Sequence, residues 1–148
     1  MTATSASRRS SAHAPRHRLR LLGAVLVAAI GGIHFYLYFD YFHRVHIIGA
    51  LFLANAATGV LIALWLLASD GVLALIAGAG FAATTLCAFL ISVHWGLFGF
   101  HERFSGTWQS TAGLVELGAV LVLGTLAAQS LLHPVRQFAE GPQQATRP

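Results

Sequence analysis

Four long apolar stretches, almost free of charged residues, constrain this chain more than any other feature of its sequence. They cover about residues 19–39, 47–67, 72–98 and 111–132. Each is long enough for a helix across the apolar core of a bilayer, which takes roughly 20 residues. Only 9% of the chain is charged, whereas a soluble domain carries about a quarter. The sequence therefore predicts an all-α transmembrane four-helix bundle, with short connections and an up-down-up-down arrangement.

The arginines indicate how such a bundle lies in the membrane. All nine basic residues are arginine, and seven of them lie in or beside the two termini. Cytoplasmic segments of membrane proteins carry the excess of basic residues, so both termini are predicted to be cytoplasmic. Residues 1–18 and 133–148 are polar and lack an apolar period, which predicts disordered tails around a membrane domain of residues 19–132. We interpret the net charge of +4 as a topology signal and a contact with membrane lipid, not with nucleic acid.

Small residues recur along two of the predicted spans and favour close contacts between helices. They form one stripe at Ala24, Ala28 and Gly32 and a longer one at Gly78, Gly80, Thr84, Ala88 and Ser92. These faces serve packing within the protein, a homo-oligomer or a membrane protein partner. Asn55, near the middle of the second span, is interpreted as a structural residue that makes a hydrogen bond between helices.

Ionisable residues gather at a similar depth near the outer ends of three spans. These are His34 in the first span, His94 in the third and Glu116 in the fourth. A rise of about 1.5 Å per residue places all three in the outer quarter of the membrane. Further histidines, His43, His46 and His101, lie in or beside the outer connections and make this face rich in histidine. Because ionisable groups inside a membrane are costly, we expect any functional site here.

This set of residues is open to several interpretations. Two imidazoles and a carboxylate suit a transition metal such as zinc, iron or copper, with His43, His46 and His101 as further candidate ligands. His34 and His94, on separate helices, suit the two axial positions of a haem b. Glu116 beside a histidine suits a proton relay. The plainer interpretation, which we favour, is structural: the histidines belong to an aromatic belt at the interface, and Glu116 accepts a hydrogen bond.

Two segments carry a resemblance to a known kind of protein. IGALFLANAATGVLIALWLL and GVLALIAGAGFAATTLCAFLISVHWGLFGFHE resemble small four-span membrane proteins of unknown function from actinobacteria. The features shared are an outer-end histidine (His34), an LFLxNA-like segment (residues 51–56), GAGF and GLFGF segments (78–81 and 96–100) and an acid in the fourth span (Glu116). The resemblance covers about residues 21–130. It implies a four-span protein of a bacterial plasma membrane and no particular activity.

Three classes of function follow from these observations. The leading hypothesis is a small, non-enzymatic membrane protein that acts as an accessory subunit or an oligomerising subunit. The alternative is a metal- or haem-binding redox module with a site formed by His34, His94 and Glu116. The third is a small transporter or a proton pathway. An enzyme is the least favoured class, because the sequence shows no nucleophile–base pair and no phosphate-binding loop.

Overall fold

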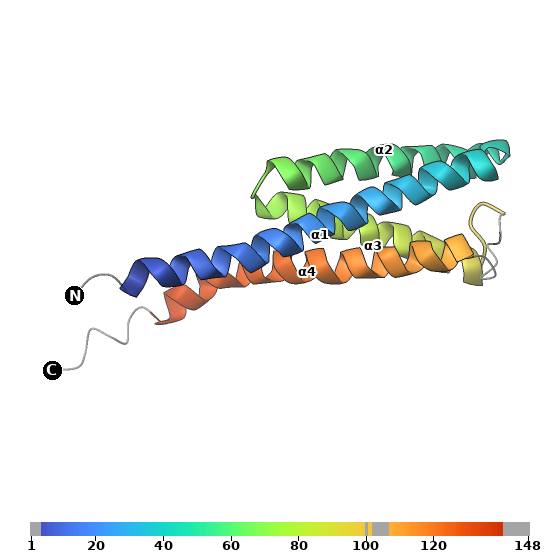
Figure 1. Ribbon diagram of the computed structural model, residues 1–148. Coiled ribbons are helices and arrows are strands. Elements are labelled where there is room, and N and C mark those ends of the chain that lie inside the picture. Colours follow the sequence, from blue (N-terminus) through green and yellow to red (C-terminus); the bar gives the residue numbers. More distant parts are fainter. Residues whose placement is uncertain (1–3, 100, 102–106, 141–148) are drawn as a thin grey trace.

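The described part of the chain consists of four long α-helices and one short turn of 3-10 helix. The computed structural model describes residues 4–99, 101 and 107–140, with side chains described for residues 15–99, 101 and 107–132. The helices are α1 (Thr4–Asp40), α2 (His46–Ala68), α3 (Val72–His94) and α4 (Thr107–Glu140), and the turn is η1 (Phe42–Arg44). Successive helices run in opposite directions, and both termini lie at the end of the bundle that holds the α2–α3 turn (Figure 1). The predicted fold class, an all-α four-helix bundle, is confirmed.

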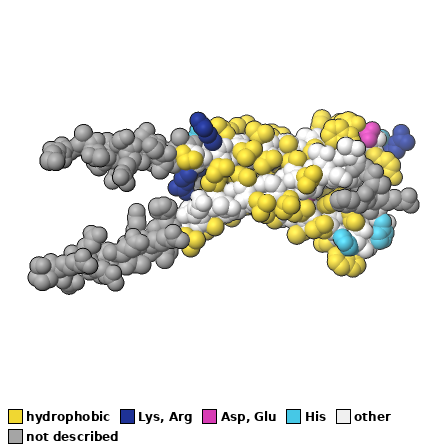
Figure 2. All heavy atoms as spheres, turned by 60° about the horizontal axis from the view of Figure 1, so that its bottom comes forward, with side chains coloured by type: hydrophobic (Ala, Val, Ile, Leu, Met, Phe, Trp, Pro, Cys, Tyr) yellow, Lys and Arg dark blue, Asp and Glu magenta, His cyan; other side chains and the backbone are white. Residues whose placement is uncertain are grey.

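Each helix contains a stretch that is long and apolar enough to cross a membrane. These stretches are Pro15–Asp40, His46–Ala68, Val72–His94 and Thr107–Leu132. Large apolar side chains in the middle of the helices point outward, for example Leu61 at 67% exposed and Leu114 at 71% exposed. On the face shown in Figure 2, charged side chains gather at the two ends, with a largely hydrophobic surface between them. Such a surface suits a lipid environment, so the chain forms a multi-pass membrane protein.

The helix bounds differ from the predicted ones at two places. Residues 4–18 and 133–140 are helical, where the sequence predicted disordered tails. A helix that is already formed extends by one hydrogen bond per residue, so the long spans continue into the adjoining segments. Residues 1–3 and 141–148 lie outside the described residues. The third helix ends at His94 instead of residue 98, because Gly96 has a φ of +82°, a left-handed conformation that commonly terminates helices.

Packing is closest between α1 and α2, where two glycines face each other. A Cβ at Gly59 would lie 3.0 Å from the Cα of Gly31, so the two backbones are almost in contact. The predicted stripe of small residues on the first span is displaced by one residue from this contact. Gly32 has no atom within 4 Å of the position of a Cβ, and Ala28 is exposed. Ala24 of the predicted stripe is buried in the apolar core, but the close contact with α2 is made by Gly31, which the stripe did not include.

The four neighbouring pairs of helices do not contact one another equally. Helix α1 packs against α2 and α4, and α4 packs against α3, whereas α2 and α3 have the fewest contacts of the four pairs. The apolar core is continuous at the end that holds the termini, where Val27, Leu66 and Leu123 are fully buried. The weak α2–α3 contact leaves room for a pocket in the other half of the bundle.

Candidate functional site

A pocket with a volume of about 340 Å³ lies between α2 and α3, in the half of the bundle that contains η1. Its walls come from these two helices, and α1 and α4 contribute His34 and Glu116. Exposed residues of both walls, Leu51 and Thr58 of α2 and Thr84 of α3, also line the pocket. All three belong to membrane-crossing stretches. The pocket is therefore accessible from the apolar surroundings of the bundle, between α2 and α3.

Glu116 is the most unusual residue of this pocket. Its side chain is only 1% exposed, and its Oε2 atom is buried with no hydrogen-bond partner among the described residues. Leaving a buried acceptor unsatisfied costs about 1–3 kcal/mol, and more for a charged group. The Oε2 atom is therefore open to a hydrogen-bond donor that enters the pocket.

Asn55 presents a second unsatisfied acceptor to the same pocket. Its Nδ2 atom donates to the Oγ1 of Thr85 at 3.0 Å, and the Thr85 hydroxyl donates to the carbonyl of Phe81 at 2.9 Å. This hydrogen bond joins α2 to α3 and makes Asn55 an interhelical contact. Its Oδ1 atom is buried and has no partner within the described part of the chain. The pocket thus holds two acceptor atoms for which the described residues supply no donor.

His34 makes a backbone hydrogen bond and a tilted aromatic contact, which together orient its ring. Its Nδ1 lies 2.9 Å from the carbonyl oxygen of Ile30, to which it donates in the Nδ1–H tautomer. That tautomer leaves Nε2 as an acceptor. The imidazole lies 4.9 Å from the ring of Phe52, which stacks on Phe42 at 4.1 Å. Phe42 is only 3% exposed and anchors η1 to α2.

The other predicted ligands lie outside this pocket. His94 is exposed, its Nδ1 is 2.9 Å from the carbonyl oxygen of Leu90, and it does not line the pocket. His43 and His46 are also exposed, and the exposed His101 has its ring against Gly96. The structure therefore brings His34 and Glu116 into one pocket and leaves His94 outside it. Over residues 15–99, 101 and 107–132, no three His, Cys, Asp or Glu side chains are grouped closely enough to hold a metal ion.

Two polar residues of α3 were missed by the sequence reasoning as members of a site. Thr85 and Ser92 are both buried and line the pocket. Their spacing of seven residues places them on one face of a helix. Together with the polar Asn55 in the preceding span, that spacing is the signal that indicates an inward-facing polar side of α3.

Four helices able to cross a membrane, with a largely apolar pocket that contains a buried carboxylate, define a small multi-pass membrane protein with a candidate binding site. Comparison with protein-family models, with curated proteins and with solved structures gave no match.

Proposed function

We propose that this is a non-enzymatic membrane protein that binds a small amphipathic molecule in the pocket between α2 and α3. A hydrogen-bond donor of that molecule, an amine or a hydroxyl group, meets Glu116 and Asn55, and its apolar body fills the rest of the pocket. The observation that carries this proposal is the buried Oε2 atom of Glu116, which has no partner among the described residues. In this proposal the ligand supplies the donor that no described residue provides.

The size and lining of the pocket support a ligand of this kind. Pockets for small molecules have volumes of roughly 300–1,000 Å³ and are mostly apolar, with a few polar groups that fix the orientation of the ligand. The volume here, about 340 Å³, lies at the lower end of that range. Phe52, Phe81 and Phe89 line the pocket and offer aromatic surface to a flat or chain-like apolar body.

A pair of probes tests this proposal directly. 2-Naphthylmethylamine and 2-ethylnaphthalene have similar shape, but only the first carries a hydrogen-bond donor. Fluorescence titration of the protein in nanodiscs should show the amine binding at least tenfold more tightly. Glu116→Met should lower the affinity for the amine by about 10- to 100-fold, the value of a hydrogen bond to a charged group. Leu117→Met, on the exposed side of the same helix turn, is the matched control and should leave it unchanged.

Two results would refute the proposal. One is equal affinity for the amine and the hydrocarbon, corrected for their partition into empty nanodiscs. The other is a Glu116→Met protein that binds the amine as well as the parent does. In either case the carboxylate of Glu116 would not recognise the donor.

An accessory or oligomerising role, the leading expectation from the sequence, is a second candidate supported by a different observation. Gly32 and Gly80 are exposed helix glycines, and neither has an atom within 4 Å of the position of a Cβ. Open glycine surfaces let a second helix approach closely. Light scattering of the purified protein measures its mass. If the parent protein and Gly80→Ile both have the mass of one chain, the protein does not self-associate through α3.

The remaining expectations stay proposals. A metal- or haem-binding module would use His34 and Glu116, which line one pocket, but His94 does not join them there. A visible spectrum and elemental analysis of the protein beside His34→Ala test that alternative.

A transporter or proton pathway would use the same carboxylate, and its test is proton flux in vesicles with Glu116→Gln. We also propose a bacterial plasma membrane with both termini cytoplasmic, on the basis of the arginine distribution and the resemblance described above.

A further inference from the structure

A second pocket, with a volume of about 470 Å³, lies at the opposite end of the bundle, beside the α2–α3 turn. It is lined by basic side chains of α1, Arg16, His17 and Arg20, together with Asp70 of the turn and Ser130 of α4. The pocket between α2 and α3 does not contain these basic residues, so its proposed ligand does not explain them. The lining residues thus include two guanidinium groups and one carboxylate, which leaves a net positive charge in the cavity.

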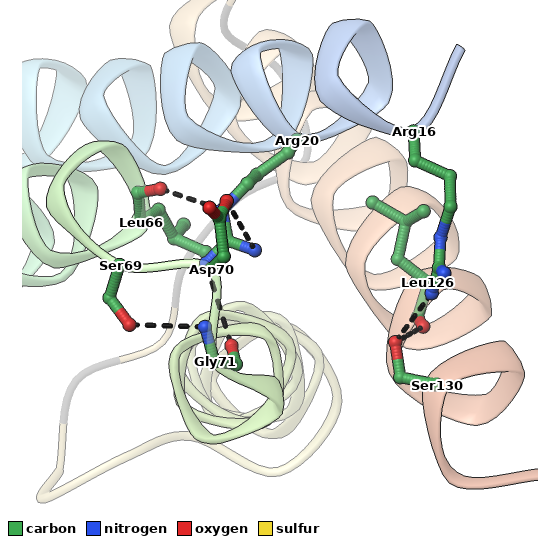
Figure 3. A network of polar contacts seen from close by, with 8 residues as sticks. All are labelled: Arg16, Arg20, Leu66, Ser69, Asp70, Gly71, Leu126 and Ser130. Carbon is green, nitrogen blue, oxygen red and sulfur yellow. Dashed lines mark hydrogen bonds and ion pairs between the residues drawn. The ribbon is translucent and has the colours of Figure 1, made fainter. Parts of the chain in front are cut away.

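Arg20 holds the α2–α3 turn in place. The side chain is largely buried, and its Nε donates to the carbonyl oxygen of Leu66 at 2.8 Å, near the end of α2 (Figure 3). Its Nη2 reaches the carbonyl oxygen of Gly71 at 3.4 Å. Its Nη1 lies 3.8 Å from Asp70 Oδ1, but the Asp70 side chain is fully exposed. Since a guanidinium group has five N–H donors, Arg20 keeps donors for a further acceptor.

Arg16 approaches the same cavity from one helical turn away. Its Nη2 donates to the Oγ of Ser130 at 2.9 Å, and that hydroxyl donates to the carbonyl of Leu126 at 2.8 Å (Figure 3). Within the described part of the chain, this is the one hydrogen bond that Arg16 makes. No described residue takes the remaining N–H groups of Arg16, so an anion that enters the pocket can accept hydrogen bonds from them.

The position of these arginines along α1 corresponds to the head-group region of a bilayer. Residues 21–39 of α1 contain no Arg, Lys, Asp or Glu, and at 1.5 Å per residue they span about 29 Å, close to the roughly 30 Å thickness of the hydrocarbon core. Arg20 and Arg16 therefore lie at the edge of that core, beside the lipid head groups. Three helices carry exposed leucines within a few residues of the pocket residues. These are Leu19 and Leu22 of α1, Leu73 of α3 and Leu132 of α4. They are exposed apolar side chains near the same ends of the helices as the pocket residues, where acyl chains can contact them.

From this geometry we infer that the pocket of Arg16 and Arg20 binds the phosphate of an anionic phospholipid. The two guanidinium groups hold the phosphate oxygens, and the acyl chains lie on the neighbouring leucines. A phosphate suits paired guanidinium groups because each can donate two parallel hydrogen bonds to its oxygens. Basic pockets between membrane helices bind lipid head groups in this way. Asp70, exposed and loosely paired, yields Arg20 to the stronger acceptor.

The experiment uses the full chain in a neutral detergent and three probes. They are dihexanoyl phosphatidylglycerol and dihexanoyl phosphatidylcholine, both below their micelle concentration, and inorganic phosphate. Isothermal titration should show phosphatidylglycerol binding at least fivefold more tightly than either other probe. Arg16→Gln should weaken it about fivefold, the effect of one basic residue on an anionic lipid. Arg18→Gln removes the same charge from a neighbouring exposed position that does not line the pocket, and should change the affinity less than twofold.

Each other outcome would overturn the inference. Equal losses in Arg16→Gln and Arg18→Gln would mean a general attraction to the basic end of the protein. Equal affinity for phosphate and phosphatidylglycerol would assign the pocket to a free anion, and no measurable binding would remove the site. Arg16→Gln is preferred to Arg20→Gln because Arg16 is exposed and does not hold the turn. Its thermal unfolding, compared with that of the parent, separates lost binding from lost fold.

Discussion

Replacing Glu116 by methionine should make the protein more stable, although it removes a polar residue from the centre of the candidate site. Methionine has a similar length and no polar group to desolvate. The buried Oε2 atom lacks a partner among the described residues, and such an acceptor costs about 1–3 kcal/mol. Replacing buried polar groups by apolar groups of the same shape can be neutral or stabilising. We therefore expect the free energy of unfolding to rise by about 1–3 kcal/mol.

Equilibrium unfolding in mixed micelles, with the SDS fraction as denaturant and circular dichroism as the signal, measures this change. The protein is delipidated first, so that no bound ligand supplies the missing donor. Leu117→Met, at a half-exposed neighbouring position, should shift the free energy by less than about 0.5 kcal/mol. If Glu116→Met instead loses 1 kcal/mol or more, the carboxylate holds the helices together, and the reasoning that assigns it to a ligand is refuted.

Three further predictions concern packing and charge. Gly59→Ala places a Cβ 3.0 Å from the backbone of α1 and should destabilise the protein by about 1–3 kcal/mol. Gly80→Ala, with no atom within 4 Å of the new Cβ, should stabilise it by about 0.5–1 kcal/mol. The same unfolding assay measures both, and equal effects would disprove the close contact at Gly59. A double-mutant cycle of Asn55→Ala and Thr85→Ala should give a coupling energy of about 0.6–1.7 kcal/mol. A coupling energy of zero would show that the hydrogen bond between α2 and α3 does not contribute to stability. Asp70→Asn should raise the affinity for dihexanoyl phosphatidylglycerol about two- to fivefold, because it frees Arg20; an unchanged affinity in the titration would show that Asp70 does not compete.

The number of helices and the depth of the polar residues could be predicted from the sequence because both depend on hydropathy along the chain. Charged residues mark the ends of the spans, and Glu116 stands out within one. The inward face of each helix could not be predicted in the same way. A helix in lipid is apolar on all sides, so it lacks the periodicity that identifies the buried face of a soluble helix. For that reason the sequence analysis assigned Gly32 to the packing face, whereas in the structure Gly31 packs against α2.

For a related reason, the depth of His94 in the membrane did not predict whether its side chain lines the pocket. A residue at the correct height can still face away from the bundle, as His94 does at the exposed end of α3. The earlier end of this helix did have a local signal, since a glycine two residues after His94 is typical of a left-handed helix terminus. The roles of Arg16 and Arg20 could not be predicted, because their partners Ser130 and Leu66 are distant in sequence.

The weak contact between α2 and α3 has a consequence for how a ligand would be selected. A pocket that is reached from within the bilayer samples the concentration of a compound in lipid, not in water. Each methylene group adds about 0.8 kcal/mol to transfer out of water, which is about a fourfold enrichment. Lengthening an alkyl chain on a ligand would therefore increase the occupancy of the pocket at a fixed aqueous concentration, even where the added carbons touch only lipid. The membrane itself would act as the first filter, and the pocket would need only modest intrinsic affinity.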